Sequence, residues 1–287
     1  MEYALEIKNL SKNYTDFQLK DISFTLEKGF IMGFIGPNGA GKSTVIRLIM
    51  NLIKRNSGEI KVFGLDNLKF ERDIKQRIGF VYDENYYYEE LSMEAMKNII
   101  APFYRGWDEY QYKKYMVEFN LNEKSKIKTL SKGMKMKFSL AMALSHNAEL
   151  IIMDEPTAGL DPVFRSELLD ITSSLIQDEK KSIFFSTHIT TDLEKVADYI
   201  TFLDKGSVVF SKPKDDILES YHIVKGDKSL LDSDTKKQFL SIRENSFGFE
   251  ALTDNISKIR EVFRNSVIIE RATLEEIMVY MVRRQIC

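Results

Sequence analysis

The stretch of sequence that decides the fold class is Gly36-Pro-Asn-Gly-Ala-Gly41-Lys42-Ser43. It satisfies the pattern G-x-x-x-x-G-K-[S/T], in which the glycines allow consecutive backbone N–H groups to converge on phosphate oxygens. A compact apolar run over residues 30–35 precedes it, and a helical pattern over residues 42–52 follows it. The motif requires this order of strand, loop and helix, so the sequence predicts an α/β fold with a phosphate-binding loop (P-loop).

The loop residues predict the ligand as well as the fold. Lys42 is expected to reach the β- and γ-phosphates of a nucleoside triphosphate, and the Ser43 hydroxyl is expected to ligate Mg²⁺. The N-terminus of the following helix adds a partial positive charge at the same place. The other residues expected to contact the nucleotide here are Gly36, Asn38, Gly39, Gly41 and Thr44.

Two acidic residues end a second apolar run, Glu149-Leu-Ile-Ile-Met-Asp154-Glu155. Ligands of open parallel sheets lie at the C-terminal ends of the strands, so both carboxylates are expected to face the phosphate loop. Asp154 would then hold magnesium through water, and Glu155 would orient and deprotonate the attacking water. A strand that ends in Asp-Glu is also typical of a turn or a helix cap, which is the alternative interpretation of this pair.

The composition indicates an ordinary soluble globular protein. Of 287 residues, 44% are hydrophobic and 29% are charged, and 41 basic against 43 acidic residues give a formal net charge of −2. This near-neutral balance argues against nucleic acid as a partner. The single cysteine forms no internal disulfide, and no apolar run approaches the roughly 18–20 residues that cross a bilayer. The single cysteine fits the reducing cytoplasm. No signal-peptide pattern is expected in residues 1–10, which have neither a basic start nor an apolar stretch.

Hydrophobic periodicity predicts how the surroundings of the loop are built. Alternating apolar residues over 2–9 and 21–27 predict the strands of an antiparallel β subdomain. An all-helical insertion is expected over about residues 84–140, with Ser92 and Asp108 as the caps of its first two helices.

Strand patterns resume after the insertion and alternate with helical patterns, which indicates a parallel sheet. These strands are expected over residues 150–153, 182–186 and 199–203. The motifs stop near residue 215, so we predict a main domain of residues 1–214 and a small α+β accessory domain of residues 215–287. The last helix of the accessory domain opens with Thr273-Leu-Glu-Glu276, a capping box.

Three further motifs follow the phosphate loop in a recognisable order. They are Leu130-Ser-Lys-Gly-Met134, Ala158-Gly-Leu-Asp161 and Ser186-Thr-His188. Over about residues 2–212, this order resembles the ATP-binding subunit of ABC transporters, in which the three motifs are called the signature, the D-loop and the switch histidine. The resemblance implies the ABC ATPase form of the P-loop fold, with ATP and Mg²⁺ as cofactors and ATP hydrolysis as the activity.

The resemblance also implies a role for each matching residue. Tyr14 would stack on adenine, and His188 would contact the γ-phosphate and steady the attacking water. Ser131 and Gly133 would cap the γ-phosphate bound to the other subunit, and Asp161 would cross the dimer interface. One chain would therefore hold two half-sites that face away from each other, so we expect a homodimer or a heterodimer with another ATPase subunit. Taken singly, these residues are also typical of a helix cap, a surface histidine and a packed aromatic.

Two positions depart from the family pattern. The signature commonly reads LSGGQ, and here Lys132 and Met134 replace its third and fifth residues. After Ile78-Gly-Phe-Val81, where the family places a glutamine that touches Mg²⁺, this chain has Asp83. Aspartate is shorter and charged, so we expect a tighter magnesium contact with a shorter reach. A working ATPase site is expected despite both changes.

The resemblance favours a transporter motor that works from the cytoplasmic face of the cell membrane. The chain would drive a separate transmembrane permease, which in the family inserts a short helix into a groove beside the glutamine loop and the helical insertion. Tyrosines 86–88 lie in this region and suit a partner surface, because they combine an aromatic body with a polar tip. They are equally typical of side chains that pack the insertion onto its own core.

The signature and the tail after Ile269 look similar to those of bacterial subunits that export peptides, toxins or drugs. An importer subunit is the alternative among transporters. A soluble ABC ATPase that acts on ribosomes or DNA is a second class of hypothesis. Lysines 124, 126, 128, 132, 135 and 137 would suit nucleic acid, but the acids that flank them favour a solvated face, so no nucleic acid is expected.

Overall fold

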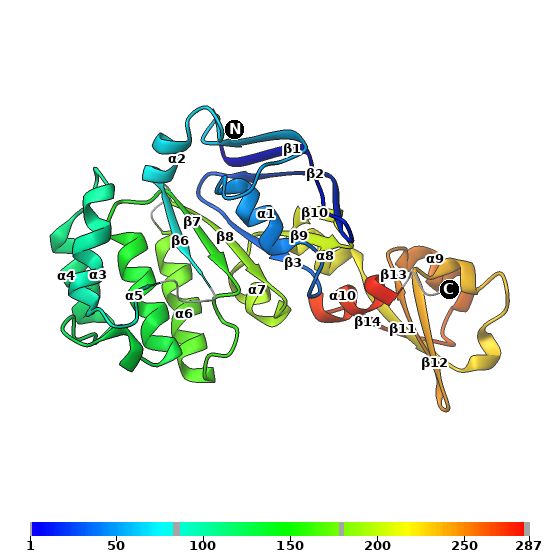
Figure 1. The fold of residues 1–287 in the computed structure, drawn as a ribbon. Coiled ribbons are helices and arrows are strands. Elements are labelled where there is room, and N and C mark those ends of the chain that lie inside the picture. Colours follow the sequence, from blue (N-terminus) through cyan, green and yellow to red (C-terminus); the bar gives the residue numbers. More distant parts are fainter. Residues whose placement is uncertain (1, 83–86, 178–180, 284–287) are drawn as a thin grey trace. The chain divides into compact units, whose positions relative to one another are not determined.

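The computed structural model describes residues 2–82, 87–177 and 181–283. The chain divides into two compact units, Met1–Ser211 and Lys212–Cys287 (Figure 1). The first unit contains all the motifs quoted above for nucleotide binding, and the capping box lies in the second unit. Asp83 lies outside the described residues.

A six-stranded sheet with the order β10-β9-β3-β8-β7-β6 forms the centre of the first unit. Its strands are β3 (Ile31–Ile35), β6 (Ile78–Val81), β7 (Leu150–Asp154), β8 (Ser182–Thr187), β9 (Tyr199–Asp204) and β10 (Ser207–Pro213). The ladders from β9 through β6 are parallel, as expected for strands that alternate with helices. Every residue of β3 and β8 is buried, which is typical of strands covered on both faces. Ile35 pairs with Thr187, and Asp154 pairs with Ser186, so the C-terminal ends of β3, β8 and β7 lie together at one edge.

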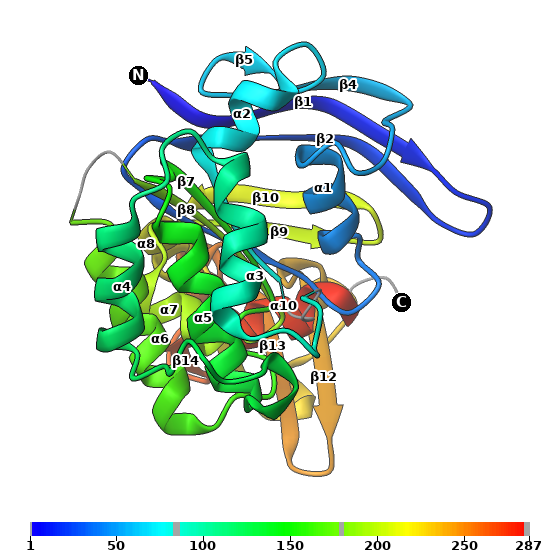
Figure 2. The same cartoon turned by 60° about the vertical axis from the view of Figure 1, so that its left-hand side comes forward.

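An antiparallel sheet with the order β2-β1-β4-β5 packs against this centre (Figure 2). Its strands are β1 (Tyr3–Asn13), β2 (Gln18–Glu27), β4 (Ser57–Val62) and β5 (Leu65–Asp66). Phe24 of β2 joins the two sheets, because its ring lies 5.4 Å from the ring of Phe34 and 5.9 Å from that of Phe184. The predicted antiparallel subdomain is therefore present, and its core is continuous with the centre of the unit.

Helix α1 (Lys42–Ile49) follows the phosphate loop and ends before the predicted limit of residue 52. The apolar pattern continues to Leu52, but Asn51 adopts a left-handed conformation with φ of 53°, which an α-helix does not accommodate. The helix extent was therefore wrong by three residues, because a turn follows where only the hydrophobic spacing was considered.

The helical insertion consists of α3 (Met93–Ile100), α4 (Glu109–Glu118) and α5 (Lys132–Leu144). Short 3-10 turns η1 (Ala101–Phe103) and η2 (Ile127–Thr129) connect them, and α2 (Glu71–Arg77) precedes β6. The Ser92 hydroxyl accepts a hydrogen bond from Ala95 N at 3.1 Å, and Asp108 accepts bonds from the first turn of α4. Both predicted helix caps are confirmed. Helices α6 (Pro162–Leu175) and α7 (Thr190–Val196) complete the first unit.

The second unit has its own antiparallel sheet with the order β12-β13-β11-β14. Its elements are α8 (Lys214–Ser220), β11 (His222–Gly226), β12 (Ser241–Asn245), β13 (Gly248–Thr253), α9 (Ile256–Phe263), β14 (Ile268–Arg271) and α10 (Leu274–Arg283). A small core gathers Phe249 of β13 and Phe263 of α9 around Val224. The capping box of α10 is confirmed, because Thr273 Oγ1 accepts from Glu276 N at 3.2 Å and Glu276 Oε2 accepts from Thr273 N at 2.9 Å.

Candidate nucleotide site

The phosphate loop connects β3 to α1 at the edge where the C-terminal ends of the parallel strands meet. Gly41 has a φ of 110°, and an ideal Cβ there would lie 2.6 Å from Leu19 and 2.8 Å from the ring of Phe17. Glycine is therefore required at this position by both its backbone conformation and the available space. A pocket of about 610 Å³ opens over the loop. Its lining residues are Phe17, Asn38, Gly39, Gly41, Lys42, Ser43, Thr44, Glu155, Ala158 and His188.

Lys42 and Glu155 face each other in this pocket. The Lys42 ammonium is only 6% exposed, donates to Gly36 O at 2.8 Å and lies 3.3 Å from Glu155 Oε1. The other carboxylate oxygen of Glu155 accepts from His188 Nδ1 at 2.8 Å and from His188 N at 3.2 Å. Glu155 has a φ of 48°, a left-handed conformation that costs a non-glycine residue energy and is often found at functional sites. The phosphate-loop lysine, the acid and the histidine thus form one connected group.

Asp154 lies beside this group with a raised pKa. Burial raises the pKa of its carboxyl, while the hydroxyls of Ser43 and Ser186 and the Lys42 charge lower it, and burial prevails. Asp154 Oδ1 is buried and has no hydrogen-bond partner among the described residues. An orphaned carboxylate oxygen beside a serine hydroxyl fits a hydrated Mg²⁺, which one or two protein oxygens and phosphate oxygens hold together. Within the described residues no group of three His, Cys, Asp or Glu side chains is placed to hold a metal.

The predicted aromatic residue has a neighbour that the sequence interpretation missed. Tyr14 is 48% exposed and does not line the pocket, whereas Phe17 does. Their ring centres lie 6.5 Å apart. The signal available in the sequence was a second aromatic residue three positions after Tyr14, directly before the apolar alternation of β2.

The signature residues and Asp161 of the D-loop do not line the pocket, although Ala158 at the start of the D-loop does. Ser131 caps α5, since its hydroxyl accepts from Met134 N at 3.2 Å, and its side chain is exposed. Asp161 caps α6 through bonds from Val163 N and Phe164 N at 3.1 and 3.0 Å. The described structure therefore brings the phosphate-loop residues together with Glu155 and His188, and it does not bring Ser131, Gly133 or Asp161 into the same pocket.

The lysines of the helical insertion are largely paired with acids. Lys126 and Lys128 contact Glu90 at 3.5 and 2.9 Å. Further along, Lys135 contacts Glu89, and Lys137 contacts Glu167, each at 2.8 Å. These pairs neutralise the face that would have suited nucleic acid. Of the three tyrosines, Tyr86 lies outside the described residues, Tyr87 packs its ring 5.1 Å from that of Phe138, and Tyr88 is 70% exposed.

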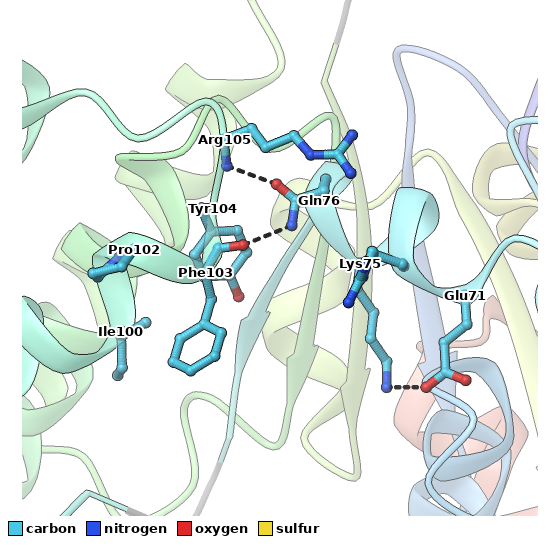
Figure 3. A pocket seen from close by; sticks show the side chains of 9 residues that line it. Glu71, Lys75, Gln76, Ile100, Pro102, Phe103, Tyr104 and Arg105 are labelled. Carbon is cyan, nitrogen blue, oxygen red and sulfur yellow. Dashed lines mark hydrogen bonds and ion pairs between the residues drawn. The ribbon is translucent and has the colours of Figure 1, made fainter.

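A second hollow, of about 800 Å³, lies between α2 and η1 (Figure 3). Gln76 of α2 spans the two sides, because its amide donates to Phe103 O at 2.8 Å and accepts from Arg105 N at 2.7 Å (Figure 3). Phe103 is 74% exposed in the hollow, and Lys75 pairs with Glu71 at 2.6 Å. A contiguous apolar and charged lining of this kind is typical of a surface that binds a partner segment. In the described residues, no helix has the length and apolar character that crossing a membrane requires.

Comparison with known proteins identifies relatives over most of the first unit. Residues 19–158 match the ABC transporter family. The "ABC transporter ATP-binding protein YtrB" of Bacillus subtilis is 32% identical over 76% of this chain and 74% of that protein. The "Bacitracin transport ATP-binding protein BcrA" of Bacillus licheniformis is 32% identical over 75% and 71%. The "Linearmycin resistance ATP-binding protein LnrL" of Bacillus subtilis is 36% identical over 74% and 70%.

Solved structures give the same result. A structure described as the "ATP binding subunit of ABC transporter" superposes with a TM-score of 0.67 at 31% identity, covering 75% of this chain and 92% of that one. The "Dimeric structure of a post-hydrolysis state of the ATP-binding cassette MJ0796 bound to ADP and Pi" has the same fold, with a TM-score of 0.64 at 23% identity over 73% of this chain and 98% of that one. Together with the pocket over the phosphate loop, these matches show that this chain belongs to the ATP-binding subunits of ABC transporters and is an ATPase.

Proposed function

We propose that this chain is the motor subunit of a bacterial ABC exporter for peptides, toxins or antibiotics. Support for this cargo class comes from the named relatives, since one is described as a bacitracin transport protein and another as a linearmycin resistance protein. The importer alternative and the soluble ribosome or DNA alternative have no comparable support. The paired lysines of the helical insertion also argue against the nucleic-acid reading.

The observation that carries the ATPase mechanism is the Glu155 carboxylate held between Lys42 and His188. Lys42 is positioned to neutralise the β- and γ-phosphates, and His188 orients the carboxylate through its Nδ1 atom. The free acceptor capacity of Glu155 then takes the proton of the attacking water as the water approaches the γ-phosphate. Ser43 and Asp154 are the residues that would hold Mg²⁺, which supplies charge neutralisation when bound.

Each chain holds one complete set of phosphate-binding groups, and Ser131, Gly133 and Asp161 lie elsewhere on the same unit. We therefore infer that these three residues act on the nucleotide of a second ATPase subunit, either a copy of this chain or a related one. Two ATP molecules would lie between the two subunits. The adenine base would contact Phe17, which lines the pocket, with Tyr14 beside it.

The permease partner is assigned to the hollow between α2 and η1. The exposed Phe103 ring offers an apolar anchor (Figure 3). Arg72, Lys75 and Arg105 add cationic groups to the lining of the hollow. Binding there would place the chain on the cytoplasmic face of the membrane. In this arrangement residues 1–214 act as the ATPase domain and residues 215–287 as an accessory domain.

Substitution of Glu155 by Gln tests the mechanism. The variant keeps the shape of the side chain but cannot accept the proton, so hydrolysis is expected to fall about 10²–10⁴-fold while ATP still binds. In the presence of ATP the variant should accumulate as a dimer, which gel filtration separates from the monomer. Glu149→Gln is the matched control, because Glu149 directly precedes β7 and pairs with Arg77, at the other end of that strand. Parental turnover by Glu155→Gln would remove Glu155 as the base.

Capture from native membranes tests the partner. Tagged chain should retain a multi-span membrane protein, and Phe103→Glu should lose it, because the charge occupies the apolar anchor. Val117→Glu is the control, since Val117 of α4 is 81% exposed and does not line the hollow. Recovery of ribosomes or DNA without a membrane protein would favour the soluble class, and equal capture by both variants would exclude this hollow as the docking surface.

A further inference from the structure

The start of the signature helix packs against the start of the helix that follows the D-loop. An ideal Cβ on Gly133 of α5 would lie 2.9 Å from Cδ1 and 3.3 Å from Cε1 of Phe164, in the first turn of α6. A contact below 3.0 Å forces one of the two groups to move. Because the Phe164 ring is only 6% exposed, it is packed on its other sides and has little room to move.

Backbone conformation does not explain the glycine at position 133. Gly133 lies inside an α-helix and is absent from the glycines with positive φ, so its backbone is one that alanine adopts more readily. The remaining physical reason is space, which is needed either for an approaching phosphate or for the Phe164 ring.

The Phe164 ring is fixed from both sides. The backbone N–H of Phe164 donates to Asp161 of the D-loop at 3.0 Å, so the residue that carries the ring is held to that loop. Above it, the Lys137 ammonium of α5 lies 5.0 Å from the ring centre and pairs with Glu167 of α6 at 2.8 Å.

We propose that Phe164 is a positioning residue that sets the signature at a fixed place relative to the D-loop, and that position 133 is glycine because the Phe164 ring takes the space of a Cβ. The inference rests on the proposed function, in which both segments act on the nucleotide of the other subunit. Two segments that act on one ligand must hold their mutual position, because a displacement of about 1 Å can reduce a rate about 100-fold. The close packing of the Phe164 ring on Gly133, which has no Cβ, fixes the position of the signature relative to the D-loop.

Compensating substitutions test this assignment. Gly133→Ala alone should lower the ATPase rate by about tenfold or more, because the added methyl separates α5 from α6. Combined with Phe164→Ala, which removes the ring, the same methyl should fit, and the double variant should return to the rate of Phe164→Ala alone. If position 133 is glycine because a phosphate must approach it, adding the methyl slows hydrolysis by the same factor with or without the ring. The double variant is then as far below Phe164→Ala as Gly133→Ala is below the parental chain, and the proposal is overturned.

Two further variants keep the test decisive. Phe164→Leu supplies a second background if Phe164→Ala does not fold, and it should rescue Gly133→Ala in part. Leu169→Ala is the matched control, since Leu169 is buried on the same helix but lies five residues further along. It should not rescue Gly133→Ala, and a rescue would show that loosening α6 is enough, which overturns the proposal.

Binding of a fluorescent ATP analogue separates this proposal from the proposed function. Affinity should stay within about twofold in every variant, because the phosphate loop of the same chain is untouched. Parental hydrolysis by Gly133→Ala would show that the Cβ is accommodated and would overturn the proposal alone. Failure of the proposed dimer would appear in a different experiment, because Glu155→Gln would then form no dimer when ATP is added.

Discussion

Two helix N-termini in the first unit are built in opposite ways. Helix α1 begins after Gly41, whose φ is 110°, and no described side chain caps it. Helix α5 begins after Ser131, whose hydroxyl accepts from Met134 N. The first helix therefore leaves its terminal N–H groups available to a ligand, whereas the second satisfies one of them within the chain.

The residues at the two helix N-termini also differ in burial. Lys42, at the start of α1, is 6% exposed and contacts both the loop carbonyl of Gly36 and the Glu155 carboxylate. Ser131 and Lys132, at the start of α5, are exposed. The phosphate loop thus gathers its anion-binding groups within one chain, whereas Ser131 and Lys132 of the signature lie on the surface, outside the pocket. The difference teaches that the pocket over the phosphate loop, which holds Lys42 and Glu155 together, and the signature are built as separate parts of this unit.

Loss of the Lys42 charge is the largest effect that this comparison predicts. Lys42→Ala removes the buried ammonium that is positioned for the β- and γ-phosphates, so ATP should bind about 100-fold more weakly or worse. Isothermal titration calorimetry measures the affinity. Lys128→Ala is the control, because Lys128 is an exposed lysine paired with Glu90 near the signature. Unchanged affinity of Lys42→Ala would contradict the assignment of the phosphate loop.

A second prediction concerns the signature side alone. Ser131→Ala should lower ATP hydrolysis about tenfold without changing ATP affinity, because in the proposed function the hydroxyl acts on the nucleotide of the other subunit. It also removes a helix cap, which costs about 1 kcal/mol of stability. Ser92→Ala removes an equivalent cap from α3, where Ser92 accepts from Ala95 N. Its thermal stability should fall to a similar extent with hydrolysis intact, so equal ATPase rates for the two variants would reduce Ser131 to a plain helix cap.

The same contrast explains what could be predicted from the sequence. The phosphate loop, the caps at Ser92 and Asp108 and the parallel strands follow from local patterns, because glycine spacing, cap residues and hydrophobic runs act over a few residues. Phe17 and Phe164 were not predicted, since each gains its place by packing against a glycine that is distant in the sequence, Gly41 for Phe17 and Gly133 for Phe164.

The strand order of the second unit could not be predicted from the sequence either. The patterns indicated strands and helices, but β11 pairs with both β13 and β14, so the strands that meet are separated by long stretches of chain. Such pairings depend on the combined packing of Phe249 and Phe263 rather than on any local signal. The role expected for Asp83 stays a prediction, because that residue lies outside the described structure.

The smallest predicted effect concerns two aspartates, Asp154 beside the phosphate loop and Asp161 in the D-loop. Burial raises the pKa of Asp154, so the folded chain favours the protonated carboxyl and this group destabilises the fold as pH rises through the raised value. Asp154→Asn should therefore raise the melting temperature of nucleotide-free protein by a few degrees at neutral pH, and the gain should shrink as pH is lowered toward the ordinary value of 3.8.

Asp161→Asn supplies the contrast on the signature side. Asp161 is exposed and accepts from the first turn of α6, and asparagine caps a helix about as well as aspartate, so little change in melting temperature is expected at any pH. Differential scanning calorimetry from neutral pH down to about pH 4 measures both variants. A stabilised Asp154→Asn that no longer hydrolyses ATP would mean that the phosphate side stores strain for its ligand. Equal behaviour of the two variants would mean that burial of Asp154 costs the fold nothing.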